Sequence, residues 1–319
     1  MQYSVKHVTK FKYLGPVRES AMEVRLQPRS DERQKCFSFR LDIEPSSQAN
    51  SYVDHAGNVV HYFDIAAQHA ELRLESRAVV DVVRPVIPTE DDSTSWELLD
   101  RSVETGDFWD YLHESQFIRQ SEALMLLADT IDLARRQPPL SLLRELSRQI
   151  YSGFEYQPLT THANSPIDEA LENRAGVCQD FAHIFIALAR RLGIPCRYVS
   201  GYLYHRSVDH DRSAQDASHA WVEAYLPEFG WLGLDPTNNI VAGDRHIVIA
   251  VGRDYADVPP TKGVFKGIGA SELQVGVRVV PATSDERQND ELPLANMPHI
   301  KTPEEEAAFE EYQQQQQQQ

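Results

Sequence analysis

The sequence has no long apolar run. Among its 319 residues, no stretch approaches the roughly 18 consecutive apolar residues of a membrane-spanning helix. The first residues, MQYSVKHVTKFKYLG, alternate polar and apolar positions, whereas a signal peptide has a continuous apolar core. The pattern predicts a protein without membrane contact, and we expect a cytoplasmic location.

Clustered positive charge is also lacking. The chain has 31 Lys and Arg residues against 48 Asp and Glu residues, a formal net charge of -17 at pH 7, and no basic stripe interrupts this balance. Binding to nucleic acid depends on clustered cations that neutralise phosphates. The composition therefore argues against nucleic acid and anionic membranes as partners.

Cysteine is scarce. Cys36, Cys178 and Cys196 form no CxxC pair, which argues against a disulfide framework and a zinc module. Five residues that could in principle bind a metal lack ligand-like spacing: Cys178, His183, His205, His210 and His219. We therefore expect no metal and no other cofactor. Cys36 and Cys196, each in a strand-like run, are interpreted as small buried apolar residues.

The first part of the chain has the alternation of β-strands. Apolar residues make up 41% and charged residues 25% of the sequence, values that are ordinary for a folded protein. From Gln2 to about Val83, period-2 runs such as KCFSFRLDIEP and NVVHYFDI are separated by turn sequences. This pattern predicts an N-terminal β-rich domain over residues 1–85, folded as an antiparallel sandwich.

The rest of the chain mixes helices with strands. Helical periodicity occurs near 96–112, 121–134 and 139–151. We expect a helical connector over 86–138 and a core over 139–281, in which strand-like runs, including LQVGVRVV, follow the last helix. Because helices and strands are segregated, the predicted fold class is α+β. Residues 282–319 are acidic and end in seven glutamines, which predicts a disordered tail.

The segment RAGVCQDFAHIFIALARRLGIP places Cys178 in the first turn of an amphipathic helix that Gly193 ends. Unpaired N–H groups and the positive end of the helix dipole stabilise a thiolate at this position. The backbone there also offers a hydrogen bond to the oxyanion of a tetrahedral intermediate. Gly176 is expected to let a substrate backbone approach closely. Asp180 and His183, on the same helix, are interpreted as capping and packing residues.

A base and its orienting group follow in SHAWVEAYLPEFGWLGLDPTN. If Leu226 pairs with Gly230 across the short turn, then Trp221 lies opposite Asp235, and His219 is a diagonal neighbour of Asp235. Diagonal neighbours are about 7–8 Å apart at the backbone, within reach of an imidazole and a carboxylate. The hairpin therefore predicts a His219–Asp235 pair. We expect Trp221 and Trp231 to pack in the core beside it.

Three motifs in this order, GVCQDFA, SHAWVEAYLPEFGW and LDPTNN, resemble the core of the transglutaminase-like superfamily of cysteine enzymes. The β-rich front resembles the N-terminal domain of its bacterial members. The resemblance implies a papain-like α+β fold, with the nucleophile helix packed on an antiparallel sheet. It also implies acyl transfer by Cys178 as nucleophile, His219 as base and Asp235 as orienting group. Tyr156, in FEYQP, is the expected second oxyanion donor, with Gln157 as the alternative.

Three functions stay open at this point. Hydrolysis of a protein or peptide substrate is favoured, because the resemblance implies that small cytoplasmic members without a calcium-binding loop are proteases. The acids of DDSTSWE lack the alternating oxygens of such a loop. Crosslinking of Gln to Lys, as by a protein-glutamine gamma-glutamyltransferase, is the second possibility. The third is a binding or scaffolding module that acts through the β-rich domain, which an intact Cys, His and Asp set disfavours.

Overall fold

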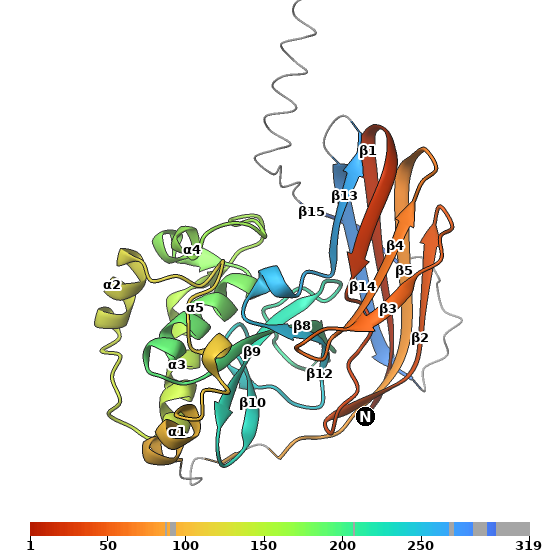
Figure 1. Cartoon of the computed structure of the whole chain (residues 1–319). Helices are drawn as coiled ribbons and strands as arrows, with labels where there is room; N and C mark the ends of the chain where they lie inside the picture. Colours follow the sequence, from red (N-terminus) through yellow and green to blue (C-terminus); the bar gives the residue numbers. More distant parts are fainter. Residues whose placement is uncertain (87, 90–93, 207, 268–270, 283–291, 298–319) are drawn as a thin grey trace, which may run out of the picture.

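The chain builds a β-rich unit and a second unit of helices around a smaller sheet, and the two pack against each other (Figure 1). The computed structural model describes residues 1–86, 88–89, 94–206, 208–267, 271–282 and 292–297. Within these ranges, no helix is both long and apolar enough to cross a bilayer.

One long strand, β1 (Gln2–Val24), organises the β-rich unit. Its first half pairs with β5 (His69–Val82) and its second half with β4 (Val59–Ile65), both antiparallel. Beyond these strands lie β2 (Gln34–Glu44), next to β5, and β3 (Asn50–Val53), next to β4. The unit has its own small core: Met22, Val24, Leu26, Phe63, Ile65, Leu72 and Leu74. The predicted β-rich front is thus one antiparallel sheet, in which β1 is shared between two sets of partner strands.

Strands from the C-terminal part complete this sheet: β13 (Thr261–Lys266), β14 (Ser271–Pro281) and β15 (Ala295–Met297). β14 pairs with the first half of β1, from Tyr3 opposite Pro281 to Tyr13 opposite Ser271. β13 and β14, which we expected to lie in the catalytic core, therefore add strands to the N-terminal sheet. The alternation of LQVGVRVV identifies a strand, but it carries no information about the partner, which lies some 270 positions earlier in the sequence.

The tail expected over 282–319 is described only in part. Within it, β15 pairs with β14, so this short segment is ordered by addition to the sheet edge. Residues 283–291 and 298–319, which include the glutamine run, lie outside the described residues.

Helix α5 (Cys178–Arg191) lies at the centre of the second unit. Every residue from Asp180 to Arg190 is buried, as expected for a helix covered on all sides. It ends at the predicted place, where Gly193 has a left-handed backbone with φ 75°. The other helices are α1 (Trp96–Val103), α2 (Glu122–Thr130), α3 (Pro139–Gly153) and α4 (Ile167–Asn173), with 3-10 turns η1 (Trp109–Tyr111) and η2 (Tyr255–Asp257).

Two helical segments differ from expectation. The helix predicted near 96–112 ends at Val103, because Gly106 adopts a left-handed backbone with φ 82° that an α-helix cannot continue through. Helix α4 has only seven residues, too few for periodicity to reveal, and it ends at Arg174, which is left-handed with φ 50°.

A second antiparallel sheet supports α5 in the order β11-β10-β9-β8-β12. Its strands are β8 (Cys196–Leu203), β9 (His219–Leu226), β10 (Gly230–Asp235), β11 (Ile240–Val241) and β12 (His246–Gly252). Helix α5 packs on β8 and β9. A short parallel pair, β6 (Glu155–Tyr156) and β7 (Ala175–Gly176), lies just before the helix. The α+β fold class is confirmed.

Two buried amide side chains join the units along the outer edge of β12. Gln34 donates to the Val248 carbonyl at 2.7 Å and accepts from the Val248 N–H at 2.9 Å. Asn58 does the same at Val251, at 2.9 Å and 2.8 Å. Each side chain therefore replaces the neighbouring strand that this edge lacks. A buried backbone group without a partner would be costly, so both amides stabilise the contact between the units.

Candidate active site

Cys178 is the first residue of α5 and is half-buried. The helix begins here because the Asp180 carboxylate accepts a hydrogen bond from the Val177 N–H at 2.8 Å and another from the Thr161 hydroxyl at 2.6 Å. Asp180 is thus the capping residue that the sequence predicts. Burial raises the pKa of Asp180, and these two hydrogen bonds only partly oppose that effect.

Gly176 has a different role from the one expected. A Cβ atom at this position would lie 2.7 Å from Oδ2 of Asp180, so a larger residue would push the capping carboxylate away from Val177. The glycine therefore makes room for Asp180. The expectation that it admits a substrate backbone is not supported, since Gly176 is itself buried.

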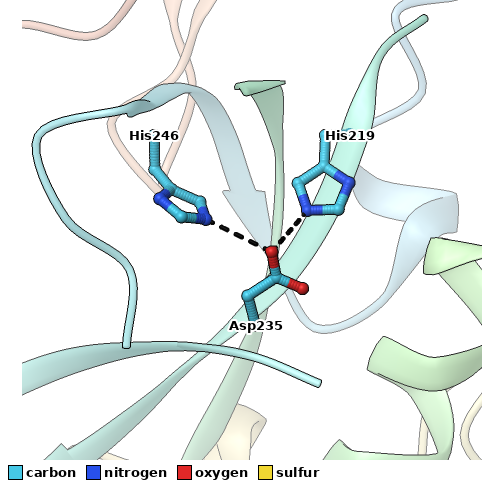
Figure 2. A group of neighbouring side chains, drawn as sticks. All are labelled: His219, Asp235 and His246. Carbon is cyan, nitrogen blue, oxygen red and sulfur yellow. Dashed lines mark hydrogen bonds and ion pairs between the residues drawn. The ribbon is translucent and has the colours of Figure 1, made fainter. Parts of the chain in front are cut away.

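His219 and Asp235 meet as the hairpin register predicts. Leu226 pairs with Gly230, and the register continues to Val222 opposite Leu234. One further step brings Asp235 to the end of β10, where its Oδ2 lies 2.8 Å from Nε2 of His219 (Figure 2). Both residues are buried, with exposed fractions of 3% for His219 and 0% for Asp235.

Asp235 accepts hydrogen bonds on both carboxylate oxygens. Oδ1 accepts from the backbone N–H groups of Thr237 at 3.0 Å and Asn238 at 3.2 Å, and Oδ2 also accepts from the Asn238 side chain at 2.8 Å. Burial would favour the neutral acid, but the charge and hydrogen bond of His219, together with His246, hold the pKa of Asp235 well below its usual range. The carboxylate is therefore a fixed negative charge beneath the imidazole.

The other ring nitrogen of His219 is available for chemistry. Nδ1 is buried and has no hydrogen-bond partner among the described residues, while Nε2 is held by Asp235. Burial would lower the pKa of His219, but the charge and hydrogen bond of Asp235, and then the side chain of Cys178, raise it to about 10. The site thus favours an imidazolium next to the cysteine.

His246, at the start of β12, is a third member of this group that the sequence did not reveal. The Gly243 N–H donates to its Nδ1 at 3.2 Å, so Nδ1 is an acceptor and the proton is on Nε2. Nε2 lies 3.3 Å from Oδ2 of Asp235 and donates to it (Figure 2). Burial lowers the pKa of His246, which keeps the ring neutral. In the sequence, His246 is only the first residue of a predicted strand. Nothing there indicates that it contacts Asp235.

The same three side chains, His219, Asp235 and His246, are close enough to be considered as metal ligands, since one ligand atom from each lies within 4.8 Å of the others. A histidine binds a metal through an unprotonated nitrogen. Here the backbone places the proton of His246 on the nitrogen that faces Asp235, and that proton is already donated to the carboxylate. The three side chains therefore fit a hydrogen-bonded group better than a metal centre.

The two tryptophans occupy different places. Trp221 is almost completely buried and stacks on the His219 ring, with centroids 5.9 Å apart, and its ring also lies edge-on to His246. Trp231 is half-buried and packs on Tyr225 and the Arg197 guanidinium. Only Trp221 packs against the histidines, as expected of a core residue that fixes the orientation of His219.

Of the two expected oxyanion donors, Tyr156 is the one near the cysteine. It pairs with Gly176 across the parallel β6–β7 contact, and its ring packs against Phe181, one turn after Cys178. Burial raises the pKa of Tyr156, and the charge of Cys178 raises it further, so the hydroxyl keeps its proton. Gln157 is exposed, and its backbone N–H donates to the Gly176 carbonyl at 2.9 Å.

The remaining sequence candidates take no part in the hydrogen bonds around Asp235. His183 is packed between aromatic rings and accepts from the Tyr255 N–H at 3.2 Å, as expected of a packing residue. His205 lies beside Asp211 at 3.2 Å. All three cysteines are free; Cys196 is buried, and Cys36, on β2, is half-buried. Burial raises the pKa of both Cys36 and Cys196, in the latter case to about 12.

Comparison with known proteins identifies the family of this chain. The sequence profile of the transglutaminase-like superfamily matches residues 129–236, and that of the bacterial transglutaminase-like N-terminal region matches residues 3–81. An uncharacterised protein of Mycobacterium leprae is 35% identical over 278 residues, which cover 86% of this chain and 97% of that protein.

More distant relatives have named activities or a solved structure. A protein-glutamine gamma-glutamyltransferase of Pseudomonas aeruginosa is 34% identical over 119 residues, or 36% of this chain and 18% of that protein. The structure of a candidate cysteine protease from Cytophaga hutchinsonii superimposes with a TM-score of 0.73 at 21% identity, covering 93% of this chain and 98% of that one. That likeness shows a shared fold, and with the sequence matches it establishes that the chain belongs to the transglutaminase-like superfamily.

Proposed function

We propose that this protein is a cysteine-dependent enzyme that hydrolyses amide or peptide bonds. The observation that carries the proposal is the position of His219, whose Nε2 is fixed by the Asp235 carboxylate while its Nδ1 is left without another partner. An imidazolium in this position stabilises a thiolate at Cys178, and the same ring can then return the proton during the reaction.

In the first half of the reaction, the Cys178 sulfur attacks the substrate carbonyl carbon and a C–S bond forms. The oxyanion accepts hydrogen bonds from the backbone N–H of Cys178, at the start of α5, and from the Tyr156 hydroxyl. His219 then donates its proton to the leaving nitrogen as the C–N bond breaks, which releases an amine and leaves a thioester. Asp235 holds the ring in the required orientation throughout.

In the second half, His219 accepts a proton from water while the water oxygen attacks the thioester carbonyl. The C–S bond breaks, the acid is released and the Cys178 thiolate is restored beside the imidazolium. If an amine replaced water, the same intermediate would give a new amide, which is the crosslinking outcome. We place hydrolysis first, because Cys178 is half-buried rather than enclosed and the cavity beside Tyr156 is open to water.

Crosslinking is the second candidate because the Pseudomonas aeruginosa relative is named as a protein-glutamine gamma-glutamyltransferase. The two outcomes differ only in the acceptor. The amide or peptide substrate, the cytoplasmic location and the individual roles of Cys178, His219, Asp235 and Tyr156 are predictions of this proposal.

The test is product analysis with a glutamine-rich protein, casein, incubated with and without a primary amine such as monodansylcadaverine. Hydrolysis predicts new peptide termini or deamidated glutamine regardless of the amine, whereas crosslinking predicts covalent attachment of the amine. The control is Cys178→Ala, which should lose both activities and keep the thermal unfolding midpoint, because removing a half-buried sulfur leaves the core of α5 intact. Activity that survives in Cys178→Ala would refute the mechanism.

A further inference from the structure

A cavity of about 590 Å³ lies beside Tyr156, between the end of α3 and the end of α4. Its lining includes Tyr156 itself, one acidic side chain, Glu155, and two arginines, Arg174 and Arg212. Tyr156 pairs with Gly176, two residues before Cys178, so the cavity shares the proposed oxyanion donor with the proposed active site.

The guanidinium of Arg212 is held in a defined position. It stacks on the Tyr151 ring at 3.5 Å from the centroid, and Nη1 donates to the carbonyls of Tyr151 at 2.6 Å and Phe154 at 3.4 Å. Its backbone N–H donates to the Asn238 side chain at 2.7 Å, and Asn238 in turn donates to Asp235. The segment that carries Arg212 is therefore tied to the proposed catalytic group.

Arg174 approaches the cavity from the other side. It is the exposed left-handed residue after α4, four positions before Cys178, and its guanidinium lies over the Phe154 ring at 5.2 Å. Within the described part of the chain, neither Arg174 nor Arg212 forms an ion pair, although acids outnumber bases in this protein by 48 to 31. Two arginines without carboxylate partners, in so acidic a protein, are available to an anion from outside.

We propose that this cavity is a substrate subsite for a carboxylate, bound by Arg174 and Arg212. The planar guanidinium, with its fixed fork of donors, suits a carboxylate better than a neutral amide. The inference rests on the proposed function and specifies its substrate: an amide or peptide with an acidic side chain or free carboxylate near the bond that is cleaved.

The test compares two alkylating reagents that differ only in this group, acetyl-Glu chloromethyl ketone and acetyl-Gln chloromethyl ketone. Each forms a C–S bond to a reactive cysteine and expels chloride. Second-order rates of alkylation at Cys178, measured by intact mass and peptide mapping at low ionic strength, should favour the Glu reagent by on the order of tenfold. Added salt should reduce this preference, because screening weakens an attraction between partly exposed charges.

Three single variants, each removing one charge, separate the subsite from the overall charge of the protein. Arg174→Gln should bring the ratio of Glu to Gln rates close to one, and Glu155→Gln should increase it. The matched control is Arg18→Gln on β1, in the N-terminal sheet, which should leave the ratio at its wild-type value. Arg174 is the better target than Arg212, because Arg212 also donates to two backbone carbonyls of its surroundings.

The possible failures are distinguishable. If Cys178 is alkylated selectively but the ratio is the same in wild type, Arg174→Gln and Arg18→Gln, the carboxylate subsite is refuted and the cysteine mechanism stands. If neither reagent labels Cys178 ahead of Cys36, the proposed function fails, and the subsite inference fails with it.

Discussion

Strand β12 makes polar contacts along its outer edge and at its first residue, and the two sets differ in whether every buried polar atom has a hydrogen-bond partner. Along its outer edge, the side-chain amides of Gln34 and Asn58 each donate one hydrogen bond to the β12 backbone and accept one from it. At its first residue, His246 joins His219 around Asp235, and there one buried atom, Nδ1 of His219, has no hydrogen-bond partner among the described residues. Buried polar groups are normally paired. In the mechanism that we propose, this unpaired nitrogen is the one that exchanges a proton with Cys178.

The largest expected effect comes from the orienting carboxylate. Asp235→Asn keeps the size of the side chain but replaces the carboxylate by a neutral amide with one acceptor oxygen and one donor NH₂ group. His219 therefore loses the negative charge that fixes its tautomer. We expect activity to fall roughly a thousandfold or more, by analogy with other His–Asp pairs. Steady-state kinetics would measure the fall, and a circular dichroism spectrum equal to that of the wild type would show that the fold is kept. A loss below tenfold would mean that Asp235 does not orient the base.

The amides on the other part of β12 should affect stability instead. Gln34→Leu leaves the buried Val248 N–H without a partner, while the Val248 carbonyl still accepts from the Arg29 N–H at 3.1 Å. We therefore expect the free energy of unfolding to fall by about 1 to 3 kcal/mol. Denaturant titration would measure this, with the exposed Gln68→Leu as the control that should change little. Activity per folded molecule should be retained. A variant as stable as Gln68→Leu would show that the edge of β12 does not depend on Gln34.

His246 lies between the two cases, because both of its ring nitrogens are hydrogen-bonded and one of them contacts Asp235 of the proposed catalytic group. His246→Phe removes a donor to Asp235, and we expect activity to fall about tenfold, the effect of one hydrogen bond to a charged group. His246→Gln, which can still donate, should recover most of the loss. Since His246 is expected to position Asp235, the pH profile of the Phe variant should shift, whereas a purely structural role would alter only stability. Equal losses in the Phe and Gln variants would count against the hydrogen bond.

The smallest expected effect concerns stability at alkaline pH. The folded-state pKa of His219 is raised to about 10, above its usual value of about 6.5, so its contribution to stability is complete below about pH 6.5 and is lost as pH rises through about 10. Between pH 8 and pH 10.5, the unfolding midpoint of the wild type should fall by a few degrees more than that of His219→Gln. Parallel curves for the two proteins would contradict the raised pKa.

The parts of the site that follow from short-range patterns could be predicted from the sequence. Helical spacing located Cys178 at the start of α5, and alternation across a three-residue turn fixed the register that joins His219 to Asp235. These relationships depend on neighbours within about twenty residues, where periodicity and turn geometry are informative.

The parts that depend on distant contacts could not be predicted. Gln34 meets Val248 across 214 positions, and β14 pairs with β1 from the opposite end of the chain. His246 was missed for a different reason. It lies only 11 positions from Asp235, but the irregular loop between β11 and β12 sets its position and its tautomer, and neither periodicity nor turn chemistry describes such a loop. The role of Gly176 was misjudged because the sequence does not show that the Asp180 carboxylate, from the first turn of α5, folds back over this glycine.

If His219 and Asp235 activate Cys178, the rate of alkylation at Cys178 should depend on His219. Wild type and His219→Gln would be treated briefly with iodoacetamide from pH 5 to 9, followed by intact mass and peptide mapping. We expect selective labelling of Cys178 near pH 6 in the wild type only, while Cys36 and Cys196, whose pKa values are raised by burial, stay unmodified. Slow labelling of Cys178 at the same rate in both proteins would contradict it.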